Sequence, residues 1–235
     1  KSHDEKHSNN GDMIRDITIG FADGLTVPFA LTAGLSSLGS TKLVVIGGLA
    51  ELFSGMISMG LGAYLAAATE RQHWEAEYQR EAWEVDHCFD REREEIFEIF
   101  DRYGISREGA RGVVNELCVS HPKGKERWVR FMMDFELQLQ EPDTSAAWKS
   151  AATMGLAYFV GGLVPMIPYF IMARAQEALF VSIAITVVIL LLFGYIKSWV
   201  TIRTTKAGIW GAVQTLLIGA AAAATSYVIV RLLDS

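Results

Sequence analysis

The chain has 235 residues, of which 51% are hydrophobic and 20% charged, and its formal net charge is −6. With a mean hydropathy of +0.23 it is too apolar for an ordinary soluble domain of that charge content, so the two characters must lie in different segments. The acidic balance and the lack of a basic stripe in the sequence exclude nucleic acid as a partner and favour cations.

Five segments are nearly free of charge and long enough to cross the hydrocarbon core of a bilayer, which takes ~20 helical residues. The first is not expected to be a cleavable signal, because acidic residues precede it and Asp23 interrupts it. We therefore predict an all-α polytopic protein in contact with membrane lipid. The five predicted spans are 17–38, 43–68, 151–172, 178–196 and 207–233.

The predicted organisation places a charged insert between the second and third spans. Lys and Arg precede the first span, occur throughout the insert and separate the fourth span from the fifth, whereas the opposite side carries only Lys42, Arg174 and Arg231. By the positive-inside rule, the amino terminus and the insert are expected in the cytosol. The expected parts are a cytosolic tail (1–16), spans one and two (17–69), a cytosolic helical metal-binding domain (70–145) and spans three to five (146–235).

Two acidic residues interrupt the first two spans, and a carboxylate in lipid is costly unless it faces a partner helix or a wet path. Asp23 lies near the cytosolic end of its span, where hydration at the interface is the alternative. Glu51 lies deeper, and Met59 shares its helical face. The small and polar residues on that face, which also allow close helix packing, are Ser54, Gly55, Ser58 and Gly62.

Such carboxyl groups suit an exchange of protons for metal ions. Poor hydration favours the protonated form, whereas an approaching divalent cation favours the charged form, so the two ions compete for the same oxygens. Asp23 and Glu51 are therefore the candidates for coupling. Because five spans are few to enclose a pathway, we expect a symmetric homodimer with the route at or near its interface.

The insert is predicted to form a small bundle of three helices. The second span shows no breaker before about Asp90, Gly104 marks a turn, and Ser106 is the expected N-cap of a helix that reaches about Ser120. A turn follows at 121–124. The next helix carries an apolar face made of Trp128, Phe131, Met132, Phe135 and Leu139.

Two pairs of glutamates lie on this insert, Glu81 with Glu84 and Glu92 with Glu95. On one straight helix they would extend over about 16 Å, too far for one ion with ligands about 2 Å away. Either several ions bind, or the helix breaks. We predict a break at 88–90, with Asp90 as a possible N-cap, that folds the second pair toward the first.

Methionines give this acidic segment a mixed ligand set. Met132 and Met133 precede Glu136, and thioether sulfur with carboxylate oxygen suits a borderline-soft divalent ion. The alternative assigns the methionines to the core and the Glu-rich run to a solvated face. The predicted metal ligands are Glu81, Glu84, Glu92, Glu95, Met132, Met133 and Glu136.

Two Glu-x-x-His elements, ending at His73 and His87, match those of di-iron bundles. Both are predicted on one helix and cannot face each other within a monomer. A membrane-tethered ferrous oxidase and a metal sensor without transport therefore remain alternatives to transport. The sequence contains no nucleophile–base set and no phosphate loop, so we do not expect the protein to be an enzyme.

The membrane motifs resemble those of the vacuolar iron transporter family, and the insert is similar to that of its members with a metal-binding domain. The motifs are Asp23-Gly24-x-x-x-Pro28-x-Ala30-x-x-Ala33-Gly34, then Glu51, then Ser58-Met59-x-x-Gly62-x-Tyr64.

The resemblance implies a homodimer of five-span subunits in the vacuolar membrane that exports ferrous iron from the cytosol into the vacuole in exchange for protons. Asp23, Glu51 and Met59 would then line the translocation path, while the seven predicted ligands would bind metal in the cytosol. Fe²⁺ would be substrate, with no permanently bound cofactor. Carboxylate-rich sites also accept Zn²⁺, Mn²⁺, Co²⁺ and Ni²⁺.

Overall fold

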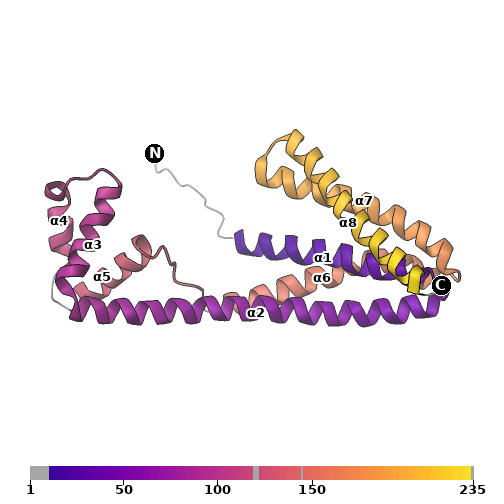
Figure 1. Ribbon diagram of the computed structural model, residues 1–235, viewed down its shortest axis with the longest axis horizontal. Coiled ribbons are helices and arrows are strands. Elements are labelled where there is room, and N and C mark those ends of the chain that lie inside the picture. The colour runs from indigo at the N-terminus through magenta and orange to yellow at the C-terminus, as the bar shows by residue number, and fades with distance from the viewer. Residues whose placement is uncertain (1–10, 119–121, 144, 234–235) are drawn as a thin grey trace, which may run out of the picture. The chain divides into compact units, whose positions relative to one another are not determined.

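The computed structural model describes residues 11–118, 122–143 and 145–233, and the regular elements in these ranges are α-helices (Figure 1). Most of the predicted tail and the first residue of the predicted turn at 121–124 lie outside the described residues, and residues 122–124 are helical instead of forming a turn, because α5 begins at Pro122. The helices are α1 (Gly11–Ser36), α2 (Thr41–His87), α3 (Phe89–Arg102), α4 (Arg107–Leu117), α5 (Pro122–Phe135), α6 (Ala146–Ile171), α7 (Ala175–Ile202) and α8 (Thr205–Leu233).

Five of these helices are long and apolar enough to cross a membrane, which confirms the number of predicted spans: α1, α2, α6, α7 and α8. Helix α2 has 47 residues and continues to His87, as the lack of a breaker predicted. Helix α1 begins at Gly11, so the last residues of the predicted tail are helical.

The chain divides into two compact units, which are described separately. The membrane unit comprises residues 1–65 and 147–235, and the insert unit comprises residues 66–146. Each unit contains one of the two groups of functional residues that the sequence predicts.

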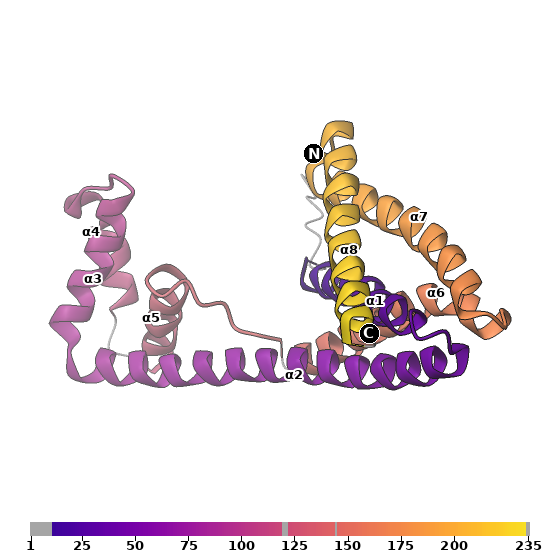
Figure 2. The ribbon, with the colours of Figure 1, turned by 45° about the vertical axis from the view of Figure 1, so that its right-hand side comes forward.

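Helices α1 and α6 of the membrane unit meet at glycines. A Cβ atom on Gly20 would lie 2.3 Å from the Met154 carbonyl oxygen, and one on Gly24 would lie 2.2 Å from that of Tyr158. The two backbones can approach this closely only because two positions of α1 that are four residues apart, 20 and 24, are both glycine. This is a small-xxx-small contact. Helix α1 also contacts α7 and α8, which pack against each other (Figure 2).

The end of α2 packs with α3, α4 and α5 around the core of the insert unit. The amphipathic pattern of these short helices explains the arrangement, because each turns its apolar stripe inward. The most buried side chains of this core include Ile96, Ile99, Val114, Trp128, Val129, Met132 and Met133.

Helix ends in the insert unit confirm one predicted cap and correct another. The Ser106 hydroxyl accepts a hydrogen bond from the Gly109 N–H, as expected of an N-cap. The helix ends at His87, as the predicted break requires. The predicted cap is wrong, because Cys88 and not Asp90 occupies the N-cap of α3, and Asp90 lies within the first turn of that helix. At that position the negative charge of the Asp90 carboxylate stabilises α3 by interacting with the positive end of the helix macrodipole, without capping a backbone N–H.

The apolar face predicted for the last helix of the insert is shorter than expected. Helix α5 ends at Phe135, which is 49% exposed, so Leu139 lies beyond it. Trp128 and Met132 are buried as predicted, and Phe131 is partly buried.

Candidate metal centre and transport path

The five predicted glutamates of the insert unit line one pocket of about 250 Å³. The end of α2 supplies Glu81 and Glu84, the break at Cys88 turns α3 so that Glu92 and Glu95 face them, and Glu136 follows α5 directly. One carboxylate oxygen from each of Glu81, Glu84 and Glu92 lies within 4.8 Å of the others, as it does for Glu92, Glu95 and Glu136. Glu92 therefore belongs to both groups.

Several oxygens in this pocket lack a partner. Glu81 and Glu92 are each 2% exposed, and their Oε2 atoms, like that of Glu136, are buried with no hydrogen bond to any described residue. The Arg91 guanidinium lies 3.2 Å from Glu95, on an exposed side chain. Buried, unpaired carboxylates are unfavourable, whereas an oxygen-binding divalent cation placed among them would satisfy several at once.

Burial and mutual repulsion raise the pKa values of these carboxyls. Burial, followed by the Glu95 and Glu81 charges, raises the pKa of Glu92 to about 8. Burial, followed by the charges of Glu136 and Glu84, raises the pKa of Glu81 to about 7, and the pKa of Glu136 is also raised, mainly by burial. A metal ion that bound in this pocket would therefore compete with protons near neutral pH.

Both methionines lie in the core of the insert unit, Met132 with 0% and Met133 with 1% of its surface exposed. Neither is among the residues that line the carboxylate pocket, although Glu136 donates its N–H to the Met132 carbonyl oxygen at 2.9 Å. Met133 lines a second cavity of about 160 Å³ with Trp74 and Tyr78. Ligation by the thioethers stays a prediction.

The two histidines of the Glu-x-x-His elements point elsewhere. The His87 ring stacks on Trp83 with centroids 4.4 Å apart, and its Nδ1 lies 2.8 Å from the Trp83 carbonyl oxygen. His73 lies 3.9 Å from Glu77. The groups of potential metal ligands among the described residues contain glutamates and neither histidine.

Glu51 has a specific partner in the membrane unit. The Tyr158 hydroxyl of α6 donates a hydrogen bond to Glu51 Oε1, and Glu51 Oε2 is buried without a hydrogen bond to the described residues. Gly55 makes room for this contact, since a Cβ there would lie 2.5 Å from the Tyr158 ring.

The other predicted path residues occupy different environments. Asp23 is exposed on α1, and Met59 is partly buried against a cluster formed by Leu52, Tyr158 and Met166. Ser54, Ser58 and Gly62 are exposed, so much of the predicted polar face of α2 points away from the other helices of its own subunit.

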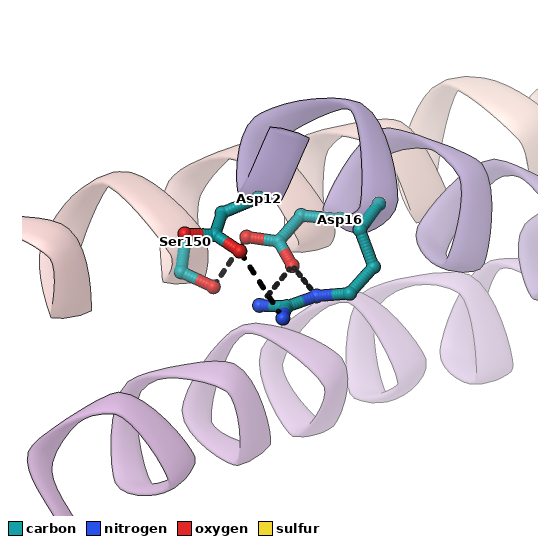
Figure 3. A network of polar contacts seen from close by, with 4 residues as sticks. Asp12, Asp16 and Ser150 are labelled. Atoms are coloured by element: carbon teal, nitrogen blue, oxygen red, sulfur yellow. Dashed lines mark hydrogen bonds and ion pairs between the residues drawn. The ribbon is translucent and has the colours of Figure 1, made fainter. Parts of the chain in front are cut away.

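Two functional candidates were not predicted from the sequence, Tyr158 and Asp16. Asp16 of α1 is 2% exposed and accepts a hydrogen bond from the Ser150 hydroxyl of α6 (Figure 3). Its carboxylate also lies 3.4 Å from Nε of Arg15, and the same guanidinium pairs with Asp12 through Nη1. Its position four residues before Gly20 was an available signal, because these residues continue the stripe of α1 that contacts α6.

Comparison with known proteins identifies the family. A model of the VIT family matches residues 14–231. Vacuolar iron transporter 1 of Tulipa gesneriana is 44% identical over 237 residues, covering 100% of this chain and 93% of that protein. Vacuolar iron transporter 2 of Oryza sativa subsp. japonica is 45% identical over 234 residues, covering 99% and 92%.

A more distant relative is Protein CCC1 of Saccharomyces cerevisiae, which is 40% identical over 232 residues and covers 94% of this chain and 69% of that protein. The family and the plant relatives are named as transporters and not as enzymes. The chain therefore belongs to the VIT family, the vacuolar iron transporters that its membrane motifs resemble.

Proposed function

We propose that this protein, integral to the vacuolar membrane, carries ferrous iron from the cytosol into the vacuole in exchange for protons. The names of its plant relatives support iron as substrate and the vacuole as destination. The observation that carries the proposal is the pocket of five glutamates with buried, unpartnered oxygens in a chain with five apolar spans.

The insert unit would bind the metal on the cytosolic side before transport. Because Glu92 belongs to both carboxylate groups, it is suited to bridge two ions, one with Glu81 and Glu84 and one with Glu95 and Glu136. Carboxylate oxygens suit Fe²⁺ and equally Mn²⁺, Co²⁺, Ni²⁺ and Zn²⁺, so this pocket would concentrate divalent metals without strong selection. Met132 and Met133 would join only if binding drew a thioether out of the core.

Transport itself would use Asp23, Glu51 and Met59. Asp23 and the Ser54–Ser58 face of α2 are exposed in one subunit, and polar groups exposed at the level of a membrane span require a partner or water. A second copy that presents the same face would enclose them, which supports a homodimer. The distribution of Lys and Arg supports a cytosolic amino terminus and insert.

Proton coupling would occur at Glu51. Its Oε2 atom is buried and has no hydrogen-bond partner among the described residues. The negative charge of the carboxylate would therefore be neutralised by binding either a proton or a metal ion. Alternate occupation by the two ions is what an antiporter requires, because bound metal expels the proton and a returning proton expels the metal.

The test is a transport assay with the purified full-length protein in liposomes that contain an iron indicator and a pH dye. We expect ferrous iron to accumulate when the lumen is acidic, with loss of luminal protons that depends on iron. Iron oxidation without accumulation would instead support the oxidase, and metal binding without either would support the sensor. Accumulation without proton movement would overturn antiport while leaving iron transport in place.

A further inference from the structure

A cysteine, Cys88, lines the carboxylate pocket of the insert unit together with the five glutamates. The sequence pattern assigns sulfur in this segment to Met132 and Met133, but neither methionine lines the pocket. Cys88 is partly buried, and its thiol is not part of a disulfide. The fold therefore brings sulfur to these carboxylates from a residue that the sequence pattern does not single out.

Backbone hydrogen bonds hold Cys88 between two of the glutamates. The Cys88 N–H donates to the Glu84 carbonyl oxygen at 2.7 Å, and the Glu92 N–H donates to the Cys88 carbonyl oxygen at 3.0 Å. Cys88 thus lies one helical turn from Glu84 at the end of α2 and one turn from Glu92 at the start of α3. The bonds that fix Cys88 at the break also bring these two glutamates together.

The side chain of Cys88 has no part in capping α3. Cys88 occupies the N-cap but makes no side-chain bond to a helix N–H, whereas the Ser106 hydroxyl makes such a bond for α4. Serine, threonine, aspartate or asparagine would stabilise this helix end better than cysteine does. Helix stability therefore does not explain a cysteine at this position, and its sulfur is available to the pocket.

The first carboxylate group, Glu81 with Glu84 and Glu92, supplies three ligand atoms within 4.8 Å of one another. A tetrahedral metal site needs a fourth donor, which is a protein side chain in sites that are closed to water. Cys88 lies one turn from two of these three residues and lines the same pocket. Its sulfur is therefore suited to be the fourth donor of the first group.

Buried oxygens in the same pocket give an independent reason to place a cation there. Glu81 and Glu92 are each 2% exposed, and the Oε2 atom of each is buried without a hydrogen bond to the described residues. A buried carboxylate without a partner is unfavourable, and a bound cation would remove that cost. The need for an ion thus comes from the glutamates, and Cys88 bears on which ion it is.

Sulfur changes the ions that such a pocket favours. Carboxylate oxygens alone suit Mg²⁺, Ca²⁺ and Mn²⁺ and select weakly among the transition metals. A thiolate is a softer donor and favours borderline ions such as Fe²⁺, Co²⁺ and Zn²⁺ over those hard ions. One thiolate beside three carboxylates would therefore favour a transition metal over Mg²⁺ and Ca²⁺.

We propose that Cys88 is a metal ligand of the insert unit and gives the first carboxylate group a preference for transition-metal ions over Mg²⁺ and Ca²⁺. The proposal rests on the metal binding by the insert unit proposed above. A divalent ion binds Sγ as the thiol releases its proton to water, and the three carboxylates complete the site. The second group, Glu92 with Glu95 and Glu136, keeps oxygen ligands alone, so the two ion positions differ in selectivity.

The sharpest test titrates the metal-free, full-length protein with Co²⁺, because cobalt bound to a thiolate absorbs in the near ultraviolet through charge transfer from sulfur. The wild type should gain this absorption, and Cys88→Ser should lose it. Cys118→Ala is the control, since Cys118 lies in the core of the same unit and not on the pocket wall, and it should keep the absorption. Metal-free Cys88→Ser should be as stable to heat as the wild type or more so, because serine can cap α3.

Selectivity is the second readout. Cys88→Ser should weaken Zn²⁺ binding at least about tenfold, as expected when the surroundings of a bound metal are altered. Mn²⁺ affinity should stay near that of the wild type, because Mn²⁺ gains little from sulfur. An equal loss for both ions would mean that Cys88 supports the pocket without choosing the metal, and would overturn the proposed preference.

The outcomes separate this proposal from the proposed function. If Co²⁺ binds and Glu92→Gln reduces the number of ions bound, but the wild type shows no sulfur absorption, Cys88 is not a ligand and the carboxylate pocket stands. Absorption that persists in Cys88→Ser would also overturn the proposal, since the sulfur would belong to another residue. If Glu92→Gln and the wild type bind Co²⁺ equally, the pocket itself fails as a metal site, and the Cys88 proposal fails with it.

Discussion

The insert unit and the membrane unit use carboxylates in opposite ways. The insert crowds five glutamates into one pocket, where their pKa values rise partly because they repel one another. The membrane unit keeps Glu51 apart from other acids on its own helix and gives it one hydroxyl partner, Tyr158. Under the proposed function, the crowded carboxylates would hold divalent ions, whereas the single carboxyl with a neutral partner would be neutralised by one proton and so would release its ion.

The largest effect is expected from Glu51→Gln. An amide cannot exchange a proton for a metal ion, so iron transport should fall below detection in the liposome assay. Metal binding by the carboxylate pocket of the insert unit, measured in the full-length protein as the bound ions that Glu92→Gln removes, should be unchanged. The control is Glu177→Gln, which alters an exposed glutamate of α7 paired with Arg174 at 2.9 Å. Transport at the wild-type rate in Glu51→Gln would remove this residue from the mechanism.

Glu92→Gln should have the next largest effect and should act on binding instead of coupling. Glu92 belongs to both carboxylate groups, so its loss should weaken divalent metal affinity at least about tenfold and reduce the number of ions bound. Calorimetric titration with Mn²⁺ and Fe²⁺ measures both quantities. Glu98→Gln, on the exposed face of the same helix, is the control. Equal stoichiometry in both variants would remove Glu92 from the metal ligands.

The stability of the metal-free insert should fall as pH rises. A carboxyl whose folded pKa lies above its ordinary value of 4.5 contributes stability below that value, and the contribution is lost as pH rises through the folded pKa, about 7 for Glu81 and about 8 for Glu92. Hydrogen exchange of α3, corrected for its intrinsic pH dependence, should show weaker protection at pH 8.5 than at pH 5.

Divalent metal should restore that protection, because it binds the folded pocket and neutralises its charge. Glu92→Gln should flatten the pH dependence in the metal-free protein. Protection that increases with pH in the wild type would contradict the raised pKa values.

The smallest effect is expected from Met132→Leu. Leucine fills nearly the same volume, so the free energy of unfolding should change by less than about 1.5 kcal/mol. Metal affinity should change far less than in Glu92→Gln, because the thioether lies in the core and not on the pocket wall. An affinity loss as large as that of Glu92→Gln would place sulfur among the ligands and make the two units more alike in ligand chemistry.

Much of the fold was predictable because it depends on local patterns. Apolar runs of about 20 residues predicted the five spans, and Ser106 predicted a helix start, since a hydroxyl reaches the N–H three residues later in any context. The break after His87 was predicted on the premise that the four glutamates bind together, because on a straight helix they would be too far apart to share an ion. The cap itself was not predictable, since Cys88 makes no side-chain cap bond.

The sequence by itself determined the candidates Glu51 and Asp23, the acidic insert and the family, because charge in an apolar run and motif spacing are visible along one dimension. Only the tertiary structure decided their partners. Tyr158 meets Glu51 across 107 residues of chain, and Ser36 meets Tyr169 across 133. Such pairs depend on how helices approach one another, through contacts such as those at Gly24 and Gly55, and no local periodicity encodes which distant side chain fills the space a glycine leaves.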